Sequence, residues 1–291
     1  MKPAPFEYHA PATLAEAVNL LQQYEDDGID AKILAGGQSL MPMLALRVAR
    51  PDVLIDLRQV AGLTGVREED GMLVVGAMEP KQTMVDAPLV RQRQPLFQAA
   101  SEWVGHRQIR NRGSVGGSFA HADPASEYPA VALVLGMEMK AVGPDGERII
   151  PADEFFVTYM TTALESTEVL AEVRIPVMAP GTRWAIQEMA RRNGDLALAG
   201  VTLTLRMEGG LCSDARIAAF GVNATAVRLT AAEEALEGQP ADAALFARAA
   251  AAGAEALEEP MTCIHASADY RRHLVKVLTE RCLAEAVGRS A

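Results

Sequence analysis

Aromatic residues and cysteines are both scarce in this sequence of 291 residues. Aromatic side chains make up 5% of it, so Leu, Val, Ile, Ala and Met must fill most of the core. The three cysteines, Cys212, Cys263 and Cys282, lie far apart and form no CxxC pattern. We therefore expect neither a CxxC metal site nor an iron–sulfur cluster in this chain. The cysteine usage is typical of a protein of the reducing cytoplasm.

The sequence also lacks an excess of basic residues and long apolar runs. Its formal net charge is −11, whereas proteins that bind nucleic acid without sequence preference need clustered Lys and Arg. No apolar run reaches the roughly 18 residues that suggest a membrane-spanning helix. The N-terminus, MKPAPFEYHAPATL, has no signal-peptide core. His265 and His273 have no matching ligand partners in the sequence, so no metal site is expected.

The order of predicted elements divides the chain into residues 1–57, 58–176 and 177–291. The first two parts read as α/β lobes. In the third part strands precede helices, which predicts an α+β domain. A capping box at Thr13-Leu14-Ala15-Glu16 predicts the start of the first helix. The strands are expected at residues 31–35, 53–55, 73–75, 137–142, 168–175, 184–189, 199–207 and 215–222, and the helices at 14–24, 89–104, 128–135, from 230 onward and after 267.

A first glycine turn, Leu34-Ala35-Gly36-Gly37-Gln38-Ser39-Leu40, follows a buried apolar run. Glycines allow close approach of the backbone to a ligand, and their N–H groups can form an anion-binding concavity. A plain strand-to-helix turn would have the same composition. Taken alone, this segment leaves both interpretations open.

A second glycine turn lies in the segment Asn111 to Pro124, which reads NRGSVGGSFAHADP. It again combines paired glycines and small hydroxyl residues, and we expect exposed N–H groups here as well. It matches neither the GxGxxG fingerprint nor a P-loop. His121 and Asp123 suggest either acid–base chemistry or residues that shape this loop. Because a dinucleotide carries two phosphates, two such turns in one chain favour a dinucleotide ligand.

The pair AGGQSL and RNRGSVGGSFAHADPASE resembles the FAD-binding medium subunit of the carbon monoxide dehydrogenase and xanthine dehydrogenase family, the molybdenum hydroxylases. The resemblance extends over essentially the whole chain, including VLAEVRIP near residue 170 and YRRHLVKVL at 270–278. It implies an α+β FAD-binding fold of the PCMH (vanillyl-alcohol-oxidase-like) type. Two N-terminal α/β lobes would hold FAD, and a C-terminal α+β domain would cover the flavin.

The resemblance also implies which residues contact FAD. The family's two glycine turns correspond to the two turns of this sequence. The family also has an acidic residue near the adenosine ribose, a leucine near one end of the cofactor, and contacts near the second turn and the flavin ring. These residues are Ile33, Leu34, Ala35, Gly36, Gly37, Gln38, Ser39, Leu40, Ser114, Val115, Gly116, Gly117, Ser118, Asp123, Glu127, Leu170, Glu188 and Leu196.

The sequence departs from the family pattern close to the flavin ring. Relatives often have a lysine in the strand that corresponds to Gln187-Glu188, where neither residue here is basic. Leu196 stands where relatives place an aromatic or aliphatic residue against the isoalloxazine. We therefore expect packing by Leu196 without aromatic stacking, and no cation from this strand.

Partners are implied by the resemblance as well: an iron–sulfur small subunit and a molybdopterin large subunit, usually as a dimer of heterotrimers. Electrons would pass from molybdenum through [2Fe-2S] clusters to FAD and on to NAD, a quinone or oxygen. No catalytic residue is expected in this chain, because the cofactor does the chemistry. The alternatives are a self-contained flavin-dependent oxidoreductase and a nucleotide-binding scaffold. The basic segment His106 to Arg112 either contacts a partner or braces the second turn.

Overall fold

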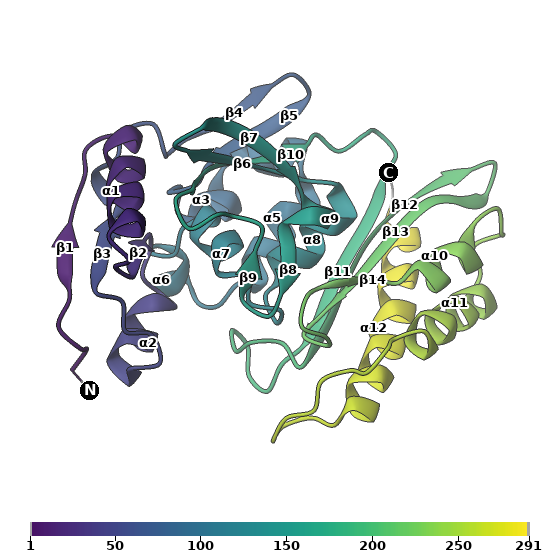
Figure 1. Cartoon of the computed structure of the whole chain (residues 1–291). Helices are drawn as coiled ribbons and strands as arrows, with labels where there is room; N and C mark the ends of the chain where they lie inside the picture. The colour runs from purple at the N-terminus through teal and green to yellow at the C-terminus, as the bar shows by residue number, and fades with distance from the viewer. Residues whose placement is uncertain (1, 290–291) are drawn as a thin grey trace.

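The N-terminal lobe is a small parallel sheet with two helices (Figure 1), and the computed structural model describes residues 2–289. In chain order its elements are β1 (Glu7–His9), α1 (Leu14–Asp26), β2 (Ala31–Leu34), α2 (Leu40–Leu46), β3 (Val53–Asp56) and the 3-10 helix η1 (Leu57–Gln59). The strands pair in the order β1-β3-β2. The predicted capping box begins α1: Thr13 Oγ1 accepts from the N–H of Glu16, and the Glu16 carboxylate accepts from the N–H of Thr13.

The second lobe is a five-stranded sheet with helices on one face. Its elements are β4 (Val66–Glu69), β5 (Met72–Gly76), α3 (Lys81–Asp86), α4 (Pro88–Arg93), α5 (Pro95–Trp103), α6 (Arg107–Arg110), α7 (Val115–His121), α8 (Glu127–Leu135), β6 (Glu138–Gly143), β7 (Gly146–Pro151), α9 (Ala152–Phe155), β8 (Phe156–Thr158), β9 (Thr161–Thr162) and β10 (Val169–Pro176). The order β4-β5-β10-β6-β7 is antiparallel throughout. Its inner face and the helices share one core, which includes Phe97, Phe119, Tyr128 and Phe155.

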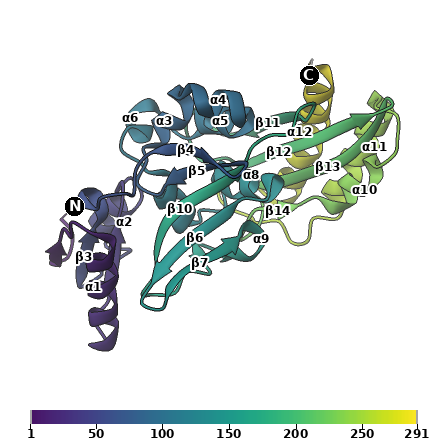
Figure 2. The ribbon, with the colours of Figure 1, turned by 90° about the horizontal axis from the view of Figure 1, so that it is seen from above.

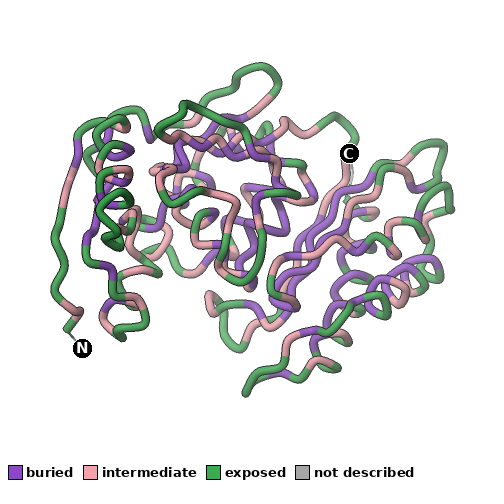
Figure 3. Tube along the Cα trace, viewed as in Figure 1, coloured by how far each residue is buried: buried purple, intermediate pink, exposed green. Residues whose placement is uncertain are grey.

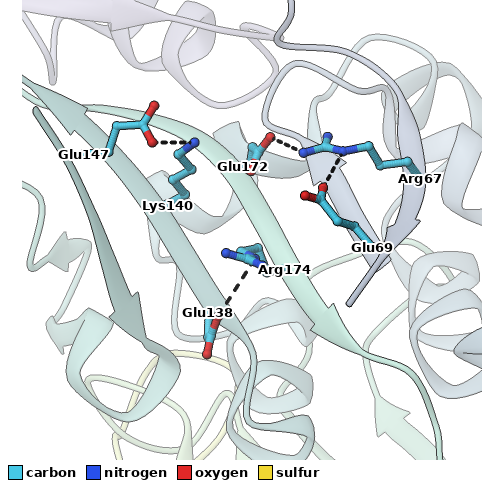
Figure 4. Close-up of polar contacts among 7 residues, drawn as sticks. All are labelled: Arg67, Glu69, Glu138, Lys140, Glu147, Glu172 and Arg174. Atoms are coloured by element: carbon cyan, nitrogen blue, oxygen red, sulfur yellow. Dashed lines mark hydrogen bonds and ion pairs between the residues drawn. The ribbon is translucent and has the colours of Figure 1, made fainter. Parts of the chain in front are cut away.

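The outer face of this sheet is partly covered by the first lobe and is otherwise charged. A bulge between Leu170 and Glu172 interrupts the alternation of β10. Leu170 belongs to the core of the second lobe, whereas its neighbour Ala171 packs into the core of the first lobe. Figure 4 shows ion pairs on the remaining outer face, including Arg67 with Glu172 at 2.8 Å. Two successive lobes are thus joined through one end of β10.

The C-terminal domain has a four-stranded antiparallel sheet with its own helices. Its elements are β11 (Arg183–Met189), β12 (Ala199–Glu208), β13 (Leu211–Phe220), β14 (Val227–Arg228), α10 (Thr230–Leu236), α11 (Ala243–Glu255) and α12 (Ala268–Gly288). The sheet order is β11-β12-β13-β14. One face packs on these three helices. The other face contributes Ile186, Ala218 and Phe220 to the core of the second lobe.

Burial follows this layering. Figure 2 shows the C-terminal sheet between the helices of the second lobe and the C-terminal helices. Buried residues run along its central strands, while the exposed residues gather on the outer loops (Figure 3). The predicted α+β class and the strand-then-helix order of the last domain are confirmed. The domain boundaries at 57 and 176 stay predictions.

The helical character predicted for residues 89–104 is confirmed. The structure divides this segment into two helices, α4 and α5, with a break at Gln94. Pro95 explains the break, because proline has no N–H and disfavours helical geometry in the residue before it. Gln94 has φ −147° and ψ 70°, outside the helical region.

Candidate cofactor-binding site

The two glycine turns, far apart in the sequence, touch each other in the structure. A Cβ on Gly36 would stand 2.3 Å from the carbonyl oxygen of Arg112, 2.7 Å from Cα of Gly113 and 2.8 Å from the nitrogen of Ser114. Only a residue without a side chain fits this contact. A Cβ on Gly117 would stand 3.1 Å from Cβ of Ala35. The predicted turns therefore form a single site between the first two lobes.

The first turn presents free backbone donors. Within residues 2–289, none of the peptide N–H groups from Gly36 to Ser39 donates a hydrogen bond to another residue. Gly37 has φ +73°, a conformation that L side chains rarely adopt. Gln38 and Ser39 are exposed, and the glycines are half-buried. Unpaired N–H groups on a glycine turn fit a phosphate group, as the sequence suggested.

The second turn differs from the sequence-based expectation of exposed N–H groups. Gly116 and Gly117 lie in the first turn of α7, which Ser114 caps. The N–H of Val115 donates to Glu79 O at 2.9 Å, and that of Gly116 donates to Ala77 O at 2.8 Å. The N–H of Gly117 donates to Ser114 Oγ at 3.2 Å. The expectation of free donors here was wrong, because the helix cap and the segment before α3 use them.

The role of these glycines is instead close packing. A Cβ on Gly116 would stand 2.4 Å from Cβ of Ala77. A Cβ on Gly117 would stand 2.7 Å from Ser114 Oγ and would disturb the cap. Gly116 therefore brings α7 against the segment before α3, and Gly117 brings it against Ala35 of the first turn.

Two buried ionisable residues lie next to the turns, and the sequence reasoning missed one of them, Lys81. Lys81 is 9% exposed and Glu127 is 7% exposed. Burial lowers the pKa of Lys81, and the negative charge of Glu127 raises it in part. Burial raises the pKa of Glu127, opposed by hydrogen bonding at its own backbone and by the Lys81 charge. Glu127 was predicted from the family pattern, but Lys81 stands at the start of an ordinary short helix, and no local sequence signal distinguishes it.

Glu188 extends this charged region into the C-terminal domain. It lies in β11, and its Oε2 is buried without a hydrogen-bond partner in the described chain. Burial and the nearby charge of Glu127 raise the pKa of Glu188 to about 8. A carboxyl with this pKa is mostly protonated at neutral pH and can donate a hydrogen bond. The structure thus links Glu188 to Glu127 electrostatically.

The remaining predicted residues are dispersed around this centre. Asp123 shapes the loop before α8, because its Oδ1 accepts from the N–H of Ala125 at 2.9 Å. Leu170 is buried in the core of the second lobe. Leu196 is 62% exposed on the loop between β11 and β12. Next to it, a Cβ on Gly194 would stand 2.5 Å from the imidazole of His106, so this loop contacts the segment that leads to the second turn.

Two arginines of the basic segment His106 to Arg112 have different surroundings. Arg110 donates from Nε to Gln82 and from Nη1 to the carbonyl oxygens of Val104 and Gly105. It therefore braces the chain before the second turn. The Arg107 side chain is 69% exposed, and its nearest carboxylate, on Asp86, is 3.9 Å away.

A cavity of about 590 Å³ lies elsewhere, between α5, β11 and α12. Its lining includes Glu188, Trp103 and Trp184, but no residue of either glycine turn. The contact between the turns, rather than this cavity, therefore defines the candidate site. Within residues 2–289 no cluster of three or more potential metal ligands occurs, and no helix combines the length and apolar character of a membrane span.

Two lobes that meet through glycine turns, one of them with unpaired N–H groups, define a dinucleotide-binding protein of α+β fold. Residues 4–178 match the family model "FAD binding domain in molybdopterin dehydrogenase". Residues 184–286 match "CO dehydrogenase flavoprotein C-terminal domain". The chain belongs to this family of FAD-binding medium subunits. The resemblance stated from the sequence is confirmed, and FAD is the cofactor of the family.

Individual relatives are similar over their full length. The carbon monoxide dehydrogenase medium chain of Hydrogenophaga pseudoflava is 40% identical over 291 residues, covering 100% of both chains. The nicotine 6-hydroxylase medium subunit of Paenarthrobacter nicotinovorans is 39% identical over 290 residues, with 100% of both chains covered. Among solved structures, the Hydrogenophaga pseudoflava carbon monoxide dehydrogenase superposes with a TM-score of 0.95 over 100% of both chains. Quinoline 2-oxidoreductase of Pseudomonas putida 86 superposes with 0.93 at 39% identity, covering 98% of each chain.

Proposed function

We propose that this chain holds FAD between its first two lobes and transfers electrons within a larger molybdenum hydroxylase. The donors would be the [2Fe-2S] clusters of a partner subunit, and the acceptor would be an external molecule. The observation that carries the proposal is the contact of Gly36 with Gly113 and Ser114, which joins the two turns into one site. When bound, flavin can accept electrons singly and pass them on as a pair.

The chain's own residues would bind and orient the cofactor. Free N–H groups from Gly36 to Ser39 would donate to the pyrophosphate. Gly116 and Gly117 would let the second turn approach it closely. Glu127 and Glu188 would supply polar contacts toward the ribose and the flavin ring. The predicted contacts of Asp123, Leu170 and Leu196 are part of the same proposal, which a structure with bound FAD would test residue by residue.

Separate chains would supply the remaining redox centres. The sequence has three cysteines, fewer than the four that hold a [2Fe-2S] cluster of the all-cysteine type. We therefore propose an iron–sulfur small subunit and a molybdopterin large subunit as partners, in a dimer of heterotrimers. The substrate would be bound in the large subunit, so this chain does not identify it.

The test is purification of the natively expressed chain under conditions that keep complexes intact. We expect it to co-purify with two other subunits and to contain FAD, iron and molybdenum. The isolated chain should not oxidise an organic substrate. A stable monomer without companions would contradict the subunit assignment. Full substrate turnover by the chain alone would favour a self-contained flavin-dependent oxidoreductase.

A further inference from the structure

Most backbone donors of the second glycine turn are already used within the protein. The N–H groups of Val115, Gly116 and Gly117 all have acceptors within the protein. The N–H of Ser118 donates to Ser114 O at 3.2 Å. Of residues 113–118, Ser114 alone has an N–H that donates to no residue of the described chain, so a pyrophosphate between the turns would find most of its backbone donors on the first turn. A full positive charge on the side of the second turn must come from a side chain.

Lys81 is the side chain placed to supply that charge. Its backbone N–H donates to Gly113 O at 2.9 Å, which fixes the start of α3 against the second turn. A Cβ on Gly113 would stand 3.5 Å from Cε of Lys81 and 3.5 Å from Cγ of Gln38. The lysine and the first turn thus flank the same glycine. The ammonium lies 5.6 Å from the ring centroid of Tyr128.

Within residues 2–289 the Lys81 ammonium has neither an ion-pair partner nor a hydrogen-bond acceptor, and it packs over the Tyr128 ring. No carboxylate lies within ion-pair distance of it, and no oxygen accepts a hydrogen bond from it. The residue is nevertheless 91% buried, being 9% exposed. Burial of an unpaired ammonium is costly unless an anion compensates it. A buried, unpartnered lysine beside a glycine turn is therefore suited to meet an anionic ligand.

We infer that Lys81 binds the pyrophosphate of the dinucleotide from the side of the second turn and supplies the charge that this turn's backbone lacks. The inference rests on the proposed function, because it requires a bound dinucleotide. It adds to that function a cofactor-binding residue which the sequence pattern did not indicate. Lys81 lies in α3 and so is separate from β11, where neither Gln187 nor Glu188 is basic.

Several other titratable or basic side chains share this environment and bear on its pH dependence. They lie on β2, α6, α7, the loop after α7, α8 and β11. They are Lys32, Arg110, His121, Asp123, Glu127, Tyr128 and Glu188. Because burial lowers the pKa of Lys81, its contribution to anion binding is present below that pKa and decreases as the pH rises through it. The other groups remain in a Lys81→Met variant, so comparing it with the wild type isolates the lysine.

The experiment compares Lys81→Met with Lys276→Met, which removes an exposed lysine of α12. Each full-length chain is purified with any subunits that accompany it, stripped of flavin and titrated with FAD. A second titration uses ADP, which has a pyrophosphate and no flavin. We expect Lys81→Met to weaken both ligands by a similar factor of about 10- to 100-fold at neutral pH. The difference in ligand affinity between Lys81→Met and wild type should shrink as the pH rises. Lys276→Met should bind both ligands with wild-type affinity.

Thermal unfolding distinguishes binding from structural support. Methionine fills the lysine's space without a buried charge, so the ligand-free melting temperature of Lys81→Met should not fall. Loss of FAD affinity with unchanged ADP affinity would overturn the inference and place the lysine near the flavin. Unchanged affinity for both ligands, or a loss that is independent of pH, would also overturn it. If wild type binds neither FAD nor ADP, the proposed function itself fails.

Discussion

Replacing Gly36 with Ala tests whether the contact between the two turns builds the site. The new Cβ would meet the backbone of Arg112, Gly113 and Ser114 at 2.3 to 2.8 Å. None of these atoms can rotate away, so the two lobes must separate locally. Overpacking of this kind typically costs about 1–3 kcal/mol. At about 2–4 °C per kcal/mol for chains of 150–250 residues, we expect the melting temperature to fall by about 2–12 °C.

The assay is thermal unfolding with and without FAD. Gly288→Ala serves as the control, because a Cβ there would have no neighbour within 4 Å. Ligand binding stabilises the folded state in proportion to RT ln(1 + [L]/Kd). FAD should therefore raise the melting temperature of wild type and of Gly288→Ala, and raise that of Gly36→Ala much less. If Gly36→Ala had the melting temperature of wild type and the same increase with FAD, the contact between the turns would not build the site.

Three further predictions concern neighbouring residues. Gly37→Val and Gly117→Val should each abolish FAD retention in a folded chain. Gly37 has φ +73°, and a Cβ on Gly117 would stand 2.7 Å from the Ser114 cap oxygen. Flavin absorbance after gel filtration measures how much FAD each variant retains. Arg110→Glu should lower stability and FAD content, because Arg110 donates hydrogen bonds to the carbonyl oxygens of Val104 and Gly105. Arg107→Glu should leave FAD bound, and it should impair subunit assembly if that segment contacts a partner. Equal behaviour of the two variants would contradict these different roles. Glu188→Gln should raise the melting temperature more at about pH 8 than at about pH 5. The pKa of the Glu188 carboxyl is raised in the folded protein, so wild type loses stability as the pH rises from the unfolded-state pKa to the folded-state pKa. A difference in melting temperature that does not change with pH would contradict this prediction.

The parts of the fold that depend on local signals were predictable from the sequence. Thr13 and Glu16 form the capping box that the pattern indicates. The apolar run before Gly36 forms β2, and the last helix begins directly after Ser267, as expected. The family pattern also indicated both glycine turns, which the structure brings into contact, and Glu127, whose contact with the cofactor stays a prediction. These features need only a few consecutive residues or a known motif.

Features that depend on tertiary contact were not predictable. The use of the second turn's N–H groups requires Ala77 and Glu79 to lie beside it, which no local pattern reveals. Lys81 resembles any surface lysine until α3 is placed against Gly113. The charge interaction between Glu127 and Glu188 arises only because the C-terminal sheet packs on the second lobe. Such couplings join residues that are distant in sequence and become visible only in the structure.

The most direct test of the central claim is the identity and amount of flavin in the natively purified chain. Acid-denatured protein would be separated from its released cofactor, and the cofactor would be identified by chromatography and mass. The account predicts FAD in an amount equimolar with the chain, together with iron and molybdenum in companion subunits. Absence of flavin, or FMN in place of FAD, would contradict it, because the chain belongs to a family of FAD-binding subunits and the proposed site between the two turns is for a dinucleotide.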